Sequence, residues 1–177
     1  MKLVGVECFA DQYFFGRLIN NRDFIRKERN DKEVIEGVTK RSRGNFSIGI
    51  IDIDKNKKIP IEYQELCASN NTTIYKHNIN CQFLMLVGPR QFEHWIKEYL
   101  TSVNKKAEDF GYNDFNGFME ESKSVKPEKN ERFKRVMDFV FENFEADNNH
   151  IHLMKKHLAY LIEKKYDFDK DEFLNIE

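Results

Sequence analysis

The sequence predicts an α/β fold with a mostly parallel sheet of about four strands, flanked by helices and followed by a C-terminal helical hairpin. Short apolar runs without helical spacing alternate with segments whose apolar residues recur every three to four positions. The strongest run, residues 46–53, is uncharged until its end, as expected for a strand buried on both faces of a parallel sheet. The last third of the chain carries only helical patterns.

Turn residues and acidic residues set the expected element boundaries. We expect strands over residues 2–7, 46–53, 72–77 and 82–87, and helices over residues 10–20, 31–41, 61–68, 92–103 and 169–175. Asp11 and Asp31 fall in the first turns of their helices, where a negative charge is favourable. Pro60 precedes the short third helix, and Gly88-Pro89 ends the last strand.

Composition divides the chain into three parts. Residues 1–106 hold every expected strand and form the α/β domain, and residues 107–130 are polar with scattered aromatics and two glycines, so they are expected to be a connecting loop. Residues 131–177 are expected to be a helical extension that packs on the core or serves as a docking arm. Two apolar stripes predict its helices: Phe133, Val136, Met137, Val140, Phe141 and Phe144, then Ile151, Met154, Leu158, Leu161 and Ile162.

The bulk composition excludes several classes of protein. The 177 residues suit one domain, and 29 basic against 30 acidic residues give a net charge of -1, so any binding surface for a charged partner must be local. The three cysteines have no metal-ligand spacing and do not indicate a disulfide framework. The first residues meet an acid too early for a signal peptide, and no apolar run is long enough to cross a membrane. We therefore expect a cytoplasmic protein with no membrane partner.

Carboxylates follow two of the expected strands. Glu7 ends the first strand, and Asp52 and Asp54 end the most apolar one. The carboxyl ends of parallel strands meet at one edge of a sheet, where open α/β sheets place their sites. Two carboxylates this close repel unless a cation or a base neutralises them, and Mg²⁺ prefers such oxygen ligands. The other interpretation of Asp52 and Asp54 is a polar turn, and Asp11 is more simply explained as a helix-start residue than as a second acid.

These acids stand in two segments that resemble the motifs of Toprim domains, which occur in topoisomerases, primases and nucleases of the overcoming-lysogenization-defect class. VECFADQYF, residues 6–14, is similar to the first motif, in which a strand ends in glutamate and a helix begins with an acid. IGIIDID, residues 48–54, is similar to the second, a buried strand ending in Asp-x-Asp. The resemblance covers residues 2–103 and implies a Toprim/Rossmann-like sheet. Cys8 departs from the pattern because it replaces the usual glycine.

The resemblance implies a nucleic-acid enzyme that uses Mg²⁺ or Mn²⁺, most simply a phosphodiester hydrolase acting on DNA or RNA. Glu7 would be a general acid or base and would complete the metal shell, and Asp52 and Asp54 would bind the metal. Lys55, Lys57 and Lys58 adjoin Asp54 and could reach a substrate phosphate. Glu93 could be an additional acid of such a site, although a solvent-facing glutamate at a helix start is the favoured interpretation.

Two alternatives stay open. Cys8 at the glycine position is compatible with a catalytically weak or inactive Toprim-like subunit, which would bind a protein partner through its C-terminal helices, for example an ATPase in a defence or repair system. Asp-x-Asp after a buried strand also occurs in haloacid-dehalogenase-type phosphatases. Those enzymes place Thr or Val two residues after the second aspartate and open near the N-terminus, whereas this chain has Asn56 and a central strand.

Overall fold

The computed structural model describes residues 2–53, 58–69, 71–146 and 149–176. The strands are Val4–Val6 (β1), Ile25–Lys27 (β2), Ser47–Asp52 (β3), Tyr63–Ala68 (β4), Thr72–His77 (β5) and Gln82–Val87 (β6). The α-helices are Phe9–Leu18 (α1), Asp31–Glu36 (α2), Phe92–Ser102 (α3), Phe115–Ser122 (α4), Glu131–Asn143 (α5), His150–Lys164 (α6) and Lys170–Leu174 (α7). Short turns of 3₁₀ helix are Arg22–Phe24 (η1), Ala107–Phe110 (η3), Pro127–Lys129 (η4) and Lys165–Asp167 (η5), and Gly37–Arg41 (η2) is a π-helical turn that continues α2.

The α/β class is confirmed, but the sheet is larger and more mixed than expected. Six strands lie in the order β2-β1-β3-β6-β5-β4. β2, β1, β3 and β6 run parallel to one another, whereas β5 and β4 run antiparallel to their neighbours. The expectation of a mostly parallel sheet of about four strands was therefore wrong in strand number and in the direction of β5. Tight connections after β4 and β5 explain the difference, because short turns join antiparallel strands and parallel strands need a crossover.

Two of the six strands were not expected. β2 has only three residues, of which Ile25 alone is buried, so it carries too little pattern to be recognised. β4 covers the range where a short helix was expected after Pro60, and this prediction was wrong. β4 is an edge strand with mostly polar, exposed side chains, and backbone pairing with β5 between Tyr63 and Ala68 decides its conformation.

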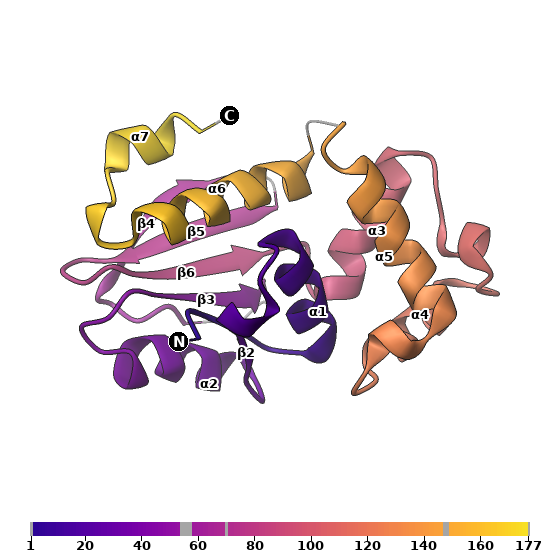
Figure 1. The fold of residues 1–177 in the computed structure, drawn as a ribbon, viewed down its shortest axis with the longest axis horizontal. Coiled ribbons are helices and arrows are strands. Elements are labelled where there is room, and N and C mark those ends of the chain that lie inside the picture. The colour runs from indigo at the N-terminus through magenta and orange to yellow at the C-terminus, as the bar shows by residue number, and fades with distance from the viewer. Residues whose placement is uncertain (1, 54–57, 70, 147–148, 177) are drawn as a thin grey trace.

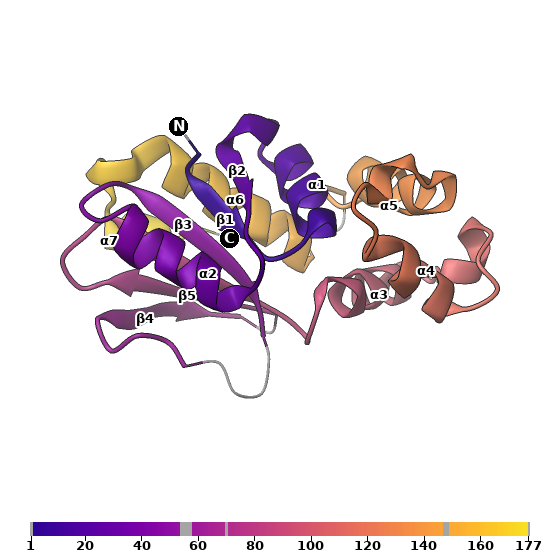
Figure 2. The ribbon, with the colours of Figure 1, turned by 90° about the horizontal axis from the view of Figure 1, so that it is seen from below.

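Helices cover both faces of the sheet (Figures 1 and 2). α1 and α6 lie on one face, and α2 lies on the other. Val34 of α2 and Val38 of η2 pack on Ile51, Leu84 and Leu86 of the sheet. A Cβ atom at Gly49 would come within 3.0 Å of side-chain carbons from Val34, Val38 and Leu84, so glycine is what allows this close approach.

α3, α4 and α5 form a lobe beyond the sheet edge toward which β3 and β6 point, whereas α7 lies beside α6 at the other end (Figure 1). Aromatic rings hold the lobe to α1: Phe14 contacts Trp95 and Phe92, with ring centroids 4.8 and 6.0 Å apart. Phe118 of α4 stacks on Phe133 of α5 at 5.7 Å. Residues 107–130, expected to be a connecting loop, thus contain η3, α4 and η4, and they contribute buried side chains to the lobe.

The two C-terminal stripes were expected to form a hairpin, but α5 and α6 do not pack side by side. α5 belongs to the lobe with α3 and α4, whereas α6 lies across the sheet (Figures 1 and 2). Each stripe is buried against its own neighbours, as Val136 and Met137 in α5 and Met154 and Leu158 in α6 illustrate. In the part of the chain that the structure describes, no helix has the length and apolar character needed to cross a bilayer.

Candidate functional site

The sheet has its topological switch point between β1 and β3. The chain leaves β1 through α1 and reaches β2 on one side, then returns through α2 on the opposite face to β3 on the other side. Open α/β sheets bind ligands beside the carboxyl ends of the two strands at such a point, which are β1 and β3 in this sheet. Glu7 follows β1 directly and Asp52 is the last residue of β3, so both predicted acids lie at this point.

Glu7 and Asp52 are joined directly. The backbone N–H of Asp52 donates a hydrogen bond to Glu7 Oε1, with the nitrogen and oxygen 2.9 Å apart. β1 pairs with β3 only through Val4 and Gly5, so the backbone ladder has ended before Asp52. The Glu7 carboxylate accepts the Asp52 N–H in place of a backbone carbonyl. The contact confirms that Glu7 and Asp52 are neighbours, and it fixes the position of one carboxylate relative to the strand that carries the other.

Cys8 and Asp11 form a reciprocal cap at the start of α1. The N–H of Asp11 donates to Cys8 Sγ at 3.3 Å, and the N–H of Cys8 donates to Asp11 Oδ2 at 3.1 Å. Cys8 has a φ of -130°, so its backbone does not require glycine. Burial raises the pKa of the Cys8 thiol, which argues against a reactive thiolate. The cysteine that departs from the Toprim pattern therefore has a local structural role, and so does Asp11 as a helix-start residue.

Asp11 also has an unusual ionisation state. It is 4 % exposed, and burial raises its pKa to about 7. The negative charges of Glu7 and Glu93 add to the rise, while hydrogen bonding with Cys8 opposes it. Asp11 is thus close enough to the carboxylates of Glu7 and Glu93 for its ionisation to depend on both.

Glu93 was expected to face solvent at the start of α3, and this interpretation was wrong. It is 5 % exposed, and its Oε1 accepts a hydrogen bond from Ser122 Oγ of α4 at 2.5 Å. The α4 helix that covers it lies in the segment expected to be a loop, so no signal in the sequence revealed the burial. Over the ranges that the structure describes, no ion pair joins Asp11 or Glu93 to a basic side chain.

The predicted phosphate-binding lysines are only partly described. Asp54, Lys55 and Lys57 lie outside the described residues, and Lys58 is exposed just after them. Two other cations lie at the same edge. Lys27 ends β2 in register with Val6, with its Nζ 4.7 Å from the Phe9 ring centroid.

The second of these cations is Arg90, which is exposed in the connection between β6 and α3. The basic residues between 17 and 43, by contrast, are largely used in structural ion pairs. Arg17 binds Asp138 at 2.6 Å, and Arg26 and Arg41 both bind the buried Glu28. Because those arginines are engaged in ion pairs, Lys27 and Arg90 are the better candidates for contact with an anionic substrate at this edge.

The donor chemistry at the switch point suits a hard divalent cation. Glu7 and Asp52 offer carboxylate oxygens, which Mg²⁺ prefers, and Mg²⁺ usually takes only one or two protein carboxylates together with water and substrate phosphates. Among the described side chains, no three of His, Cys, Asp and Glu converge closely enough to hold an ion by themselves. A metal here would therefore depend on a small protein ligand set completed by water or phosphate.

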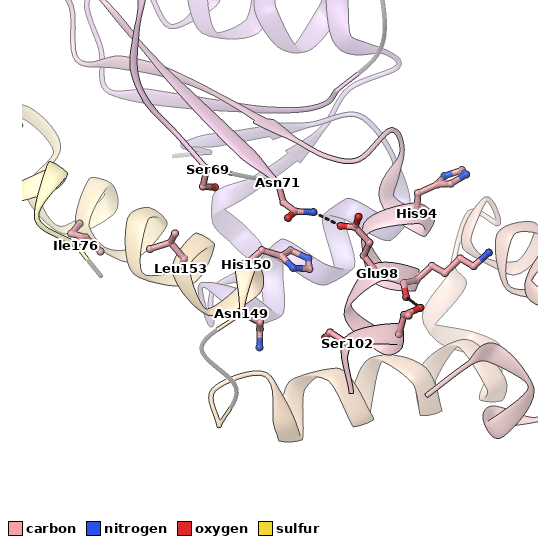
Figure 3. Close-up of a pocket in the computed structure, with 11 residues that line it drawn as sticks. Ser69, Asn71, His94, Glu98, Ser102, Asn149, His150, Leu153 and Ile176 are labelled. Atoms are coloured by element: carbon pink, nitrogen blue, oxygen red, sulfur yellow. Dashed lines mark hydrogen bonds between the residues drawn. The ribbon is translucent and has the colours of Figure 1, made fainter. Parts of the chain in front are cut away.

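One large cavity is separate from these acids. It has a volume of about 1060 Å³ and lies between the β4–β5 turn, α3 and the start of α6 (Figure 3). Asn71 Nδ2 and Glu98 Oε2 are hydrogen-bonded within it, and His150 reaches into it from α6. Burial lowers the pKa of His150, so its ring tends to be neutral.

Comparisons with known proteins identify no relative: no family model matches the chain, and neither the curated proteins nor the solved structures give a match.

Proposed function

We propose that this protein is a Mg²⁺-dependent phosphodiester hydrolase that acts on nucleic acid through a Toprim-like carboxylate site. The observation that carries the proposal is the contact between Glu7 and Asp52 at the switch point of the sheet. The site residues come from separate segments in the order that the resemblance implies, Glu7 after the first strand and Asp52 after the second motif. Mn²⁺ would substitute for Mg²⁺ because both take oxygen ligands.

Glu7 and Asp52 would hold the metal, and Asp54 belongs to the same proposed set although it lies outside the described residues. Bound there, a divalent cation would supply charge stabilisation for the phosphate and a more acidic water. Glu7 lies near enough to Asp52 to take or return a proton beside the metal. Asp11, whose pKa is about 7, would carry its own proton for part of the time at neutral pH and so limit its repulsion with Glu7 and Glu93.

Cations around the switch point would position the polyanionic substrate. Lys27 ends β2, Arg90 lies in the connection after β6, and Lys58, with the proposed Lys55 and Lys57, follows the Asp-x-Asp segment. Phosphate contacts of this kind give affinity that falls steeply with salt. The near-zero net charge of the chain agrees with a local rather than a global attraction for nucleic acid.

A nuclease assay tests the proposal. Wild type, Asp52→Ala and Asp54→Ala are compared on single- and double-stranded DNA and RNA with Mg²⁺, with Mn²⁺ and with chelator. Glu65→Ala is the matched control because Glu65 is an exposed carboxylate on β4 of the same sheet. We expect metal-dependent cleavage by wild type and by the control, with a loss of at least about 100-fold in both aspartate variants. Equal cleavage by all four proteins would sink the assignment.

The alternative of an inactive, partner-binding subunit rests on fewer observations. The two apolar stripes that motivated it are buried within this chain, in α5 and α6. Wild type that binds nucleic acid or a protein but never cleaves with either metal would favour this alternative. Size-exclusion chromatography with light scattering would then be the next measurement, and a well-behaved monomer would count against an obligate partner.

A further inference from the structure

A second, smaller cavity lies on the α6 face of the sheet. Its volume is about 160 Å³, and it is enclosed by the β4–β5 hairpin, α6 and α7 with the residues that follow α7. This cavity lies near the edge of the sheet that carries the acids, because Thr72 pairs with Val87 and Val87 pairs with Asp52. Ser69, Leu153 and Ile176 line both this cavity and the large one in Figure 3, so the two adjoin.

Two of the residues that line the small cavity carry buried polar atoms without a hydrogen-bond partner. Thr72 is 5 % exposed and its Oγ1 has no partner; His157 is 8 % exposed and its Nδ1 has none, within the described part of the chain. The His157 ring is held in place by stacking on Phe173, with centroids 4.8 Å apart. A buried polar atom left unsatisfied costs about 1–3 kcal/mol, so two at one cavity call for a partner.

The cavity carries no formal charge at neutral pH. Burial lowers the pKa of His157 to about 4 and raises the pKa of the Cys67 thiol, so both side chains are neutral. No Asp, Glu, Lys or Arg is among its described lining residues, and Ile74, Leu153 and Phe173 give it apolar walls. An ionised ligand would therefore lose its hydration without gaining a counter-charge.

The size and the wall chemistry define the ligand. A cavity of this volume exceeds the roughly 30 Å³ that one liquid water occupies several-fold, and an apolar cavity of about 150 Å³ accepts a benzene-sized molecule. We propose that the cavity binds a compact, uncharged molecule with a ring-sized apolar body and one hydroxyl group, which hydrogen-bonds to the unpartnered Thr72 Oγ1. This inference goes beyond the proposed hydrolase and does not depend on it.

Phenol is a suitable probe because it has such a ring and one hydroxyl. Cys67 lines the cavity and Cys81 does not, so the alkylation rate of each cysteine, followed by peptide mass spectrometry, reports occupancy at a known place. Bound phenol should slow alkylation of Cys67 by the factor 1 + [phenol]/Kd, about tenfold at nine times Kd, and leave Cys81 unchanged. Amide NMR shifts at Thr72, His157 and Phe173 should saturate with the same Kd.

Thr72→Val tests the hydroxyl contact while keeping the side-chain shape. We expect it to weaken phenol binding about tenfold, the equivalent of one hydrogen bond of about 1.4 kcal/mol. Thr73→Val is the matched control because Thr73 is the next residue of β5 and points to the opposite face of the sheet. Three outcomes would overturn the proposal: equal slowing at Cys67 and Cys81, unsaturated or absent shifts around the cavity, or equal phenol affinity in both valine variants.

Discussion

The parallel and antiparallel halves of the sheet differ in the charge of the polar groups that lie beside the edge they share. At the ends of β1 and β3, acids gather: Glu7 contacts the Asp52 backbone, and Asp11 and Glu93 are buried nearby. At the β4–β5 hairpin, Thr72 and His157 are buried and neutral, beside a cavity. Like charges repel, and the negative charges of Glu7 and Glu93 add to the rise that burial causes in the pKa of Asp11. If both proposals hold, the parallel half serves charge chemistry and the antiparallel half binds a neutral ligand.

The largest expected effect is the loss of cleavage when an acid of the parallel half is replaced. Glu7→Gln should lower metal-dependent cleavage about 100-fold or more, because an amide holds neither a metal nor a proton as a carboxylate does. Unfolding by urea should change by less than about 1 kcal/mol, because the glutamine oxygen can still accept the Asp52 N–H. Glu65→Gln on the exposed face of β4 should leave cleavage at the wild-type rate. A fully active Glu7→Gln protein would remove the distinction between the halves.

The next effect concerns the aromatic cluster that supports the acid edge. Phe14 is fully buried and contacts the rings of Phe15, Phe92 and Trp95. Phe14→Ala should lower the free energy of unfolding by about 3–5 kcal/mol, since a large cavity would open beneath α1 and α3. Ile61→Ala is the control, because Ile61 is 92 % exposed and should change stability by less than about 0.5 kcal/mol. Equal urea midpoints for the two variants would contradict this packing.

The acid half should become less stable as pH rises. The pKa of Asp11 is raised from its ordinary value near 3.8 to about 7, so the folded state binds the extra proton between these values. Its contribution is complete below pH 4 and is lost as pH rises toward 7, with a limiting slope of about 1.4 kcal/mol per pH unit. In Asp11→Asn this decline should disappear. Urea unfolding from pH 4 to pH 7 measures it, and an unchanged pH profile would show that Asp11 ionises normally.

The neutral half should respond in the opposite direction. The pKa of His157 is lowered from 6.5 to about 4 by burial, so the folded state binds less proton than the unfolded chain. Its contribution is complete above pH 6.5 and is lost as pH falls toward 4. His157→Leu should remove this acid sensitivity, whereas His77→Leu, at a half-buried histidine of β5, should keep it. If both leucine variants lose stability on acidification as wild type does, His157 is not the group responsible.

The parallel core of the fold was predictable because its strands are short apolar runs with a clear end. β1, β3 and β6 fall within the expected ranges, and the acid at the carboxyl end of each of the first two follows from the sequence directly. β4 was not predictable, since an edge strand exposes polar side chains whose spacing fits a helix equally well. The helices of residues 107–130 were not predictable, because the buried residues of this segment, such as Tyr112 and Phe118, are too far apart to form a helical stripe.

The site was predictable only where it depends on strand ends. Glu7 and Asp52 were placed together by topology alone, but the burial of Glu93 depends on α4, which arrives from a distant part of the chain. In the sequence, Cys8 is only a residue that replaces the usual glycine, whereas in the structure it caps α1. The cap was not predictable because it depends on the positions of two backbone N–H groups. The neutral cavity had no sequence signal, because Thr72, His157 and Phe173 come together only in three dimensions.

The most direct test of the central claim is the anomalous scattering of Mn²⁺ in crystals of the wild-type protein grown with saturating Mn²⁺. The account predicts an anomalous peak about 2 Å from carboxylate oxygens of Glu7 and Asp52, at the carboxyl ends of β1 and β3. The peak should vanish in Asp52→Ala crystals of the same form. Ordered Glu7 and Asp52 side chains without such a peak, in wild-type crystals that bind Mn²⁺ elsewhere, would contradict the proposed metal site.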